Sequence, residues 1–138
     1  MLSLEGKITF PEVIKRLSAT GVERYTCDLV GLKTYYYSID NLTFTLDMPI
    51  DLPEVSRIFD GASIKHALNE IQQGKSIYPD FLKTIAVAGC SHYEVYFNGK
   101  KALYFGRAGS HYIEYFPLPK LWKLDLKYEN PMRLGADR

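Results

Sequence analysis

The feature that most constrains the fold of this chain is an internal repeat. Residues 10–49 align with residues 78–117 at a constant shift of 68, without a gap. Eight of the forty aligned positions are identical, where composition alone predicts about two or three. Several of the identical residues mark the ends of structural elements: Pro11 and Pro79, Gly21 and Gly89, Gly31 and Gly99, Pro49 and Pro117. The repeat predicts two copies of one supersecondary unit.

Each copy is predicted to be a helix followed by three strands. Pro11 and Pro79 suit a first helical turn, where a missing N–H costs nothing. Apolar residues recur behind them at helical spacing, and Gly21 and Gly89 then suit the left-handed position after a helix. The alternation that follows predicts strands over 22–29, 32–39 and 42–47 in copy one, and over 90–97, 100–107 and 110–116 in copy two.

The other segments complete a single domain over residues 1–138. Residues 50–77 link the copies, and within them Asp60 is expected to cap a helix over 60–73 that ends at Gly74. The tail, 118–138, alternates from Trp122 to Tyr128, which suits an edge strand or a segment packed over the sheet. The predicted class is α+β, with two αβββ units and a largely antiparallel sheet. The copies are expected to join edge to edge, or to face each other, with pseudo-twofold symmetry.

The hairpin turns sort the strand residues between two faces. Asn98-Gly99 favours a two-residue type I′ turn, with Val30-Gly31 at the same place in copy one. With that register, the face expected under the helices carries Tyr25, Cys27, Leu29, Leu32, Thr34, Tyr36, Tyr93, Val95, Phe97, Lys100, Ala102 and Tyr104. The opposite face carries Arg24, Thr26, Asp28, Lys33, Tyr35, Tyr37, His92, Glu94, Tyr96, Lys101, Leu103 and Phe105.

The opposite face, called here the mixed face, carries aromatic, apolar and charged residues together. A sheet face of this composition is seldom exposed to solvent alone. If Asp40-Asn41 and Ala108-Gly109 are also two-residue turns, this face continues through Ile39, Leu42, Phe44, Leu46, Arg107, Tyr112 and Glu114. Three covers are possible: helix 60–73 with the Trp122 tail, a second subunit, or a ligand.

The candidate ligand-binding residues on this face are Tyr35, Tyr37, His92, Glu94, Tyr96, Arg107, Tyr112 and Glu114. Tyr35, Tyr37 and Tyr96 would stack on a ring, and Arg107 would hold a carboxylate or phosphate. His92, Glu94 and Tyr96 alternate along one strand like a small acid–base array. The competing interpretation is that Arg107 pairs with Glu114 across strands and that the array is an exposed polar face.

Composition removes several classes of function. Net charge is +1, which does not favour nucleic acid as a partner. The sequence shows no apolar run long enough to span a membrane and no signal peptide, so membrane partners are not expected. The cysteines, Cys27 and Cys90, and three scattered histidines have no metal-ligand spacing, so neither a metal nor a cofactor is expected. Both cysteines are expected to be small buried hydrophobes.

The chain also resembles a family of small bacterial proteins of unknown function. The resemblance rests on Phe10-Pro11-Glu12, Tyr35-Tyr36-Tyr37-Ser38-Ile39-Asp40 and the run from His111 to Pro117, among others, and covers about Phe10 to Pro117. Members, including the YbcV-like proteins, are often labelled "phage envelope protein". The resemblance implies a cytoplasmic, sometimes phage-related protein, with no established activity, cofactor or catalytic residues.

Three functional hypotheses follow. The first is a non-catalytic module that binds a small molecule with an aromatic or anionic group on the mixed face. The second is a protein-interaction or phage-associated adaptor that acts as a homodimer through the same face. The third and weakest is a small enzyme with His92 or His111 as its base. Sequence alone identifies no reaction and no ligand.

Overall fold

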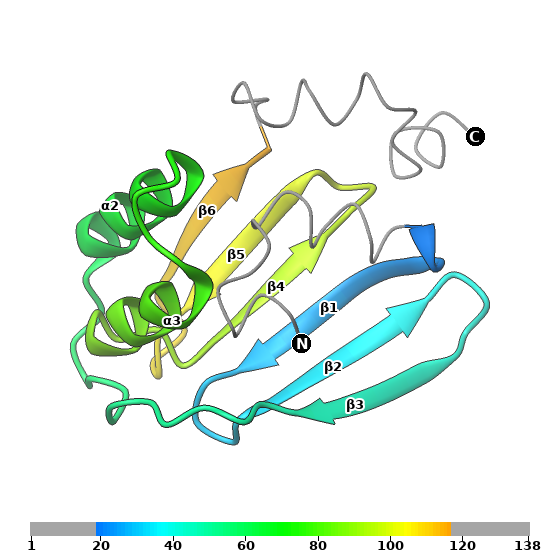
Figure 1. Ribbon diagram of the computed structural model, residues 1–138, viewed down its shortest axis with the longest axis horizontal. Helices are drawn as coiled ribbons and strands as arrows, with labels where there is room; N and C mark the ends of the chain where they lie inside the picture. Colours follow the sequence, from blue (N-terminus) through cyan, green and yellow to red (C-terminus); the bar gives the residue numbers. More distant parts are fainter. Residues whose placement is uncertain (1–18, 117–138) are drawn as a thin grey trace.

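The computed structural model describes residues 19–116, which form one six-stranded antiparallel sheet with two helices on one of its faces (Figure 1). Helices α2 (Gly61–Gln72) and α3 (Tyr78–Val87) follow the third strand along the chain. The strand order is β3-β2-β1-β4-β5-β6, with bounds β1 (Val22–Asp28), β2 (Lys33–Ser38), β3 (Thr43–Asp47), β4 (His92–Tyr96), β5 (Lys101–Phe105) and β6 (His111–Tyr115).

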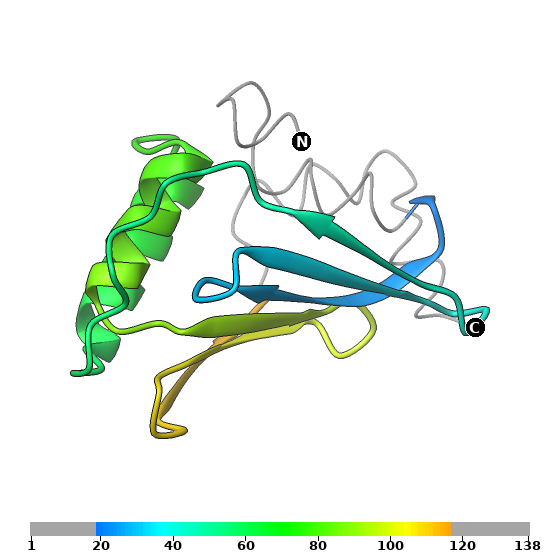
Figure 2. The same ribbon diagram turned by 90° about the horizontal axis from the view of Figure 1, so that it is seen from below.

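The α+β class and the antiparallel sheet are therefore confirmed. The helix expected before Gly21 and the tail from residue 118 lie outside the described residues. Figure 2, which shows the sheet edge-on, places the helices in a layer of their own beside the twisted strands.

The two three-stranded meanders share one pairing register. Tyr25 pairs with Tyr36 in β1–β2, and 68 residues later Tyr93 pairs with Tyr104 in β4–β5. The outer pairs agree in the same way, since Tyr36↔Phe44 corresponds to Tyr104↔Tyr112. The meanders meet along β1 and β4, edge to edge. At the middle of that contact Thr26 pairs with Glu94, the residue to which the shift of 68 relates it.

The helix ends follow the predicted chemistry. Asp60 caps α2, and its Oδ1 accepts a hydrogen bond from the Ser63 N–H at 3.2 Å. Gly74 follows α2 with a φ of 75°. Pro79 lies in the first turn of α3. After α3, Gly89 takes a φ of 92°, and the Cys90 N–H donates to the Ile85 carbonyl at 2.9 Å, the bonding of a Schellman motif.

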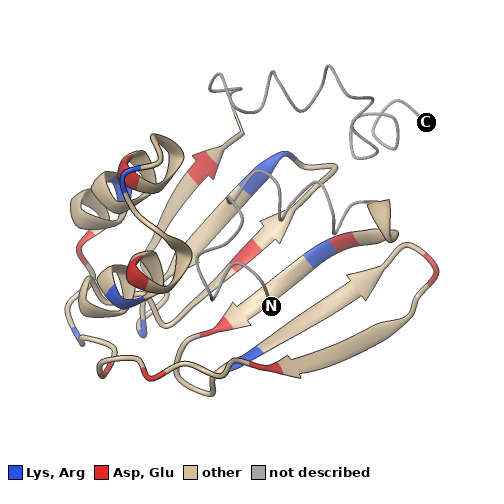
Figure 3. Ribbon diagram, viewed as in Figure 1, with Lys and Arg blue, Asp and Glu red and all other residues tan. Residues whose placement is uncertain are grey.

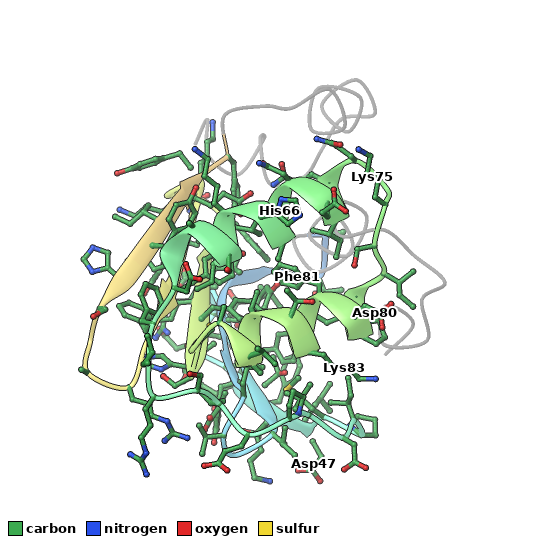
Figure 4. The ribbon with its side chains drawn as sticks, turned by 90° about the vertical axis from the view of Figure 1, so that its left-hand side faces the viewer. Asp47, His66, Lys75, Asp80, Phe81 and Lys83 are labelled. Carbon is green, nitrogen blue, oxygen red and sulfur yellow. The ribbon has the colours of Figure 1, made fainter. Side chains whose placement is uncertain are left out.

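The core lies between the helices and the face predicted to be buried. Tyr25, Cys27, Tyr93, Val95 and Tyr104 are all buried there. Phe81 of α3, labelled in Figure 4, packs edge-on against Tyr104 with ring centroids 6.4 Å apart. Of the three alternative covers for the mixed face, helix 60–73 is excluded, because α2 packs on the core side, where Gln72 donates a hydrogen bond to Glu114.

The turns between the second and third strands of each meander differ from the prediction and change which residues share a face. Each is a three-residue connection, not a two-residue one: the Gly106 N–H donates to the Ser110 carbonyl and the Ser38 N–H to the Leu42 carbonyl. The left-handed position falls on Gly109 in one and on Asn41 in the other, as in a type I turn with a bulge. The register moves by one residue, so every side chain beyond the turn changes face.

The first hairpin turns have the predicted register but another conformation. Asn98-Gly99 was expected to supply two positive φ values, and instead Lys100 is left-handed, with a φ of 52°. The Lys100 N–H donates to the Phe97 carbonyl at 3.2 Å, so Asn98 and Gly99 form the centre of an ordinary turn. In the first meander Leu32, at the matching place, has a φ of 57°.

Candidate functional site

The face of the sheet that the two helices leave uncovered, called here the open face, carries a row of aromatic and basic side chains. Tyr37, Arg24, Tyr96 and Lys101 are direct neighbours on the four strands β2, β1, β4 and β5. We call these four residues the aromatic–basic row. Because cross-strand partners point to the same side of a sheet, the row places alternating rings and cations along a line that crosses the strands.

Arg24 is the best-defined cation of the row. Its guanidinium carbon lies 3.7 Å from the centroid of the Tyr37 ring, a cation–π contact. No carboxylate among residues 19–116 forms an ion pair with it. Stacking fixes the plane of the guanidinium and leaves its N–H groups at the edge of that plane available to an acceptor.

Tyr96 is held beside Arg24 by Glu94. The Tyr96 hydroxyl donates to Glu94 Oε1 at 2.5 Å. This hydrogen bond, together with burial and the charge of Glu94, raises the pKa of Tyr96 to about 12, while the charge of Arg24 acts in the opposite direction. The ring is therefore fixed in place and neutral at physiological pH, and it faces the same side as the Arg24 guanidinium.

A second group occupies the other end of the open face. The His92 ring stacks on Phe105, with centroids 4.8 Å apart and an angle of 11° between the planes. Its Nδ1 lies 2.9 Å from Ser91 Oγ. Across the sheet, Asp28 accepts hydrogen bonds from the Val30 and Gly31 N–H groups at 2.9 Å. The predicted array of His92, Glu94 and Tyr96 does share one face, but only Glu94 and Tyr96 are joined by a hydrogen bond.

The eight predicted site residues do not form one site. Five lie on the open face, namely Tyr35, Tyr37, His92, Glu94 and Tyr96. Tyr112 and Glu114 lie on the core side, opposite Tyr104 and Ala102, since the three-residue turn shifts the register of β6. The prediction that they continue the mixed face is wrong, and the same holds for Phe44 and Leu46 on β3.

Arg107 is hydrogen-bonded to the backbone of another loop. It lies in the turn between β5 and β6, and its Nε and Nη2 donate to the Val55 carbonyl at 3.3 and 3.1 Å. The expected pairing of Arg107 with Glu114 is absent from the described part of the chain. Arg107 therefore anchors the loop that precedes α2, and the best-defined cation of the open face is Arg24.

Glu114 is a half-buried acid on the core side of the sheet. Its carboxylate accepts hydrogen bonds from Gln72 of α2 and, at 3.5 Å, from the Tyr104 hydroxyl. Burial raises its pKa to about 7 in spite of both hydrogen bonds, each of which acts to lower it. Its surroundings are the helix–sheet interface, so its charge affects folding more directly than binding.

The cysteines offer no nucleophile. Cys27 and Cys90 are both buried and unpaired, as predicted. Burial raises the pKa of each thiol to about 12, so neither forms a thiolate at neutral pH. Between residues 19 and 116, no group of three histidine, cysteine or acidic residues is placed to hold a metal ion.

Sequence reasoning placed Arg24 and Lys101 on the open face but omitted both from the site. The signal was present: the correct hairpin register makes Arg24 the neighbour of Tyr37. Its pairing with Tyr96, by contrast, depends on how β1 meets β4, and the repeat alone leaves that open.

Comparison with known proteins gives a family and no activity. No helix within residues 19–116 is both long and apolar enough to cross a membrane. No curated protein matches the chain. A family profile described as "Protein of unknown function (DUF1398)" matches residues 41–114, which run from the turn before β3 into β6. The phage-related label and the cytoplasmic location stay predictions. The chain therefore belongs to the DUF1398 family, proteins of unknown function.

Proposed function

We propose that this protein is a non-catalytic binding module whose open face takes a small molecule with an aromatic ring and an anionic group. One observation carries the proposal: the Arg24 guanidinium is stacked on Tyr37 and next to Tyr96, without a carboxylate partner in the described residues. A carboxylate on the ligand would accept two N–H bonds from the guanidinium. Its ring would then lie over Tyr96.

The charge pattern favours a ligand with one or two negative charges over a polyanion. Figure 3 shows basic and acidic residues interspersed across the sheet. Arg24 and Lys101 lie two strands apart, a distance of about 10 Å. Glu94 lies on β4, the strand between them, two residues before Tyr96. Glu94 would repel a continuous phosphate backbone, whereas a single carboxylate at Arg24 avoids it.

We also infer that the two meanders belong to duplicated αβββ units. The shared registers support this, as does the pairing of Thr26 with Glu94. Under the shift of 68, the aromatic–basic row corresponds to a second row made of Phe105, His92, Asp28 and Lys33. There an aspartate replaces Tyr96, and its charge disfavours an anion. Only one of the two equivalent rows suits the proposed ligand, as expected when a duplicated scaffold specialises one half.

The proposal predicts that aromatic carboxylates bind and that Arg24 is their anchor. In a titration followed by amide NMR, benzoate and 4-hydroxybenzoate are expected to shift signals of β1, β2, β4 and β5. Arg24→Gln is expected to weaken binding about tenfold or more, because a hydrogen bond to a charged group contributes roughly 1.5–3 kcal/mol. Lys33→Gln is the matched control, since Lys33 lies outside the row and pairs with Asp47 at 2.6 Å.

Two results would contradict this function. One is that neither benzoate nor 4-hydroxybenzoate shifts these signals at millimolar concentration. The other is that Arg24→Gln and Lys33→Gln weaken binding equally, which would indicate general charge attraction rather than a site at the aromatic–basic row.

A further inference from the structure

β3 is an edge strand whose outer backbone groups are unpaired among the described residues. On its inner side it pairs with β2. The flanking bonds, from the Ser38 N–H to the Leu42 carbonyl and from the Met48 N–H to the Leu32 carbonyl, fix which residues face inward. Since hydrogen-bonded pairs alternate in an antiparallel ladder, Phe44 and Leu46 bond to β2. The N–H and C=O groups of Thr43, Thr45 and Asp47 point outward.

The same strand exposes large apolar side chains. Phe44 is 48% exposed and Leu46 is 51% exposed on the core side of the sheet. At the other edge of the sheet, the equivalent residues Tyr112 and Glu114 are half-buried, and Glu114 is bonded to α2. An uncharged, exposed β-strand with free backbone groups is a template for pairing with another strand. Only Asp47 carries charge on β3, and Lys33 neutralises it.

We propose that β3 pairs with β3 of a second copy of this chain, antiparallel and centred on Thr45. In this register Thr45 faces Thr45 of the second copy, Thr43 faces Asp47, and Phe44 faces Leu46. Each outward N–H then meets an outward C=O, so all three outward residues of both strands are satisfied. The two six-stranded sheets become one continuous sheet about a twofold axis.

A second copy fits this edge because the strand is complementary to itself. Phe44 and Leu46 bury their exposed faces against each other on the core side. On the open side, the Thr43 hydroxyl of each copy donates to the Asp47 carboxylate of the other copy. The Asp47 carboxylates of the two copies lie four residue positions apart along the strand direction. Like charges directly opposite each other, which destabilise a strand pair, are avoided. The contact is smaller than a standard interface, so the dimer is expected to dissociate at low concentration.

The oligomeric state tests the proposal with a single-residue change at the centre of β3. Size-exclusion chromatography with light scattering is expected to give about twice the 15.8 kDa chain mass at 100 µM. Thr45→Pro is expected to give a monomer with an unchanged circular dichroism spectrum, because Pro removes an outward N–H that β2 does not use. Thr45→Val keeps that N–H and is expected to remain a dimer.

Disulfide cross-linking tests the register. Opposed residues of a hydrogen-bonded pair have Cα atoms about 5.5 Å apart, within the range that a disulfide spans. Thr45→Cys is therefore expected to give a covalent dimer on mild oxidation. Thr43 is also exposed but lies about 14 Å from Thr43 of the second copy in this register, so Thr43→Cys is expected to stay monomeric on denaturing gels. The native cysteines are buried and do not compete.

Three outcomes would overturn the proposal. The first is a wild-type monomer at 100 µM. The second is a dimer that survives Thr45→Pro, which would place the contact elsewhere, for example on the open face. The third is cross-linking of Thr43→Cys as efficient as that of Thr45→Cys, which would mean another register. The titration with benzoate and 4-hydroxybenzoate is measured independently of the oligomeric state, so the two proposals can fail separately.

Discussion

Gly89→Ala is expected to destabilise the protein by about 4 kcal/mol, among the largest effects of any single methyl group. Two costs combine. Gly89 has a φ of 92°, and a left-handed conformation costs a residue with a side chain roughly 1–2 kcal/mol. A Cβ at this position would also lie 2.3 Å from the Ile58 carbonyl oxygen. That carbonyl belongs to a loop held against α3 by a hydrogen bond from the Asp60 N–H to the Ala88 carbonyl, so it has little room to retreat.

Gly21→Ala separates the two costs. Gly21 occupies the matching position of the first meander with nearly the same φ, 88°, but no atom of residues 19–116 lies within 4 Å of a Cβ built there. We expect it to lose only the conformational part, about 1 kcal/mol. Urea denaturation of both variants gives the comparison. Equal losses would mean that the loop through Ile58 yields freely and that backbone conformation alone makes position 89 a glycine.

The fold was predictable where local chemistry and the repeat agree. Asp60, Pro79 and Gly89 each mark a helix end by a local mechanism that does not depend on the rest of the fold. The buried face followed from alternation through a hairpin, so Tyr25 and Tyr93 were placed correctly. The repeat allowed the edge-to-edge arrangement but did not select it, because the sequence does not state which strand of each meander pairs with the other.

The candidate site was harder to predict because it depends on turn length. Asn41 and Gly109 each permit a left-handed residue, and both two-residue and three-residue connections can use one. Choosing the shorter turn moved Tyr112 and Glu114 to the wrong face, since a slip of one residue reverses every side chain. Arg107 was misplaced for a different reason: its partner, the Val55 carbonyl, is 52 residues away in the chain and is backbone, so no side-chain pattern signals it.

Glu114→Gln is expected to stabilise the protein by about 2 kcal/mol at pH 8 and to have little effect at pH 4. Burial raises the pKa of Glu114 from 4.5 to about 7 in the folded state, so the folded state holds this proton more tightly than the unfolded chain does. Its stabilising contribution is complete below pH 4.5 and is lost as the pH rises to 7. The full shift would be worth about 3 kcal/mol, and the remaining contact of the side chain with water lowers our expectation.

The groups around Glu114 allow the substitution to remove the charge without leaving a neighbouring polar group unbonded. Gln72 of α2 donates to Oε2 of Glu114, and Tyr104 of β5 donates to Oε1. In a glutamine at position 114 the carbonyl accepts the bond from Gln72, and the amide NH2 donates to the Tyr104 hydroxyl oxygen, without the buried charge. The other ionisable groups that its charge reaches, Tyr25 and Tyr112, are phenols that stay neutral across this range. Urea denaturation at pH 4, 5.5, 7 and 8 measures the effect, with Glu23→Gln, an exposed carboxylate on β1, as the control for removing one negative charge. If Glu114→Gln shows the same pH dependence of unfolding as the wild type, another group dominates the titration. The α2–β6 contact would then tolerate the charge, because water reaches Glu114 more freely than its packing indicates.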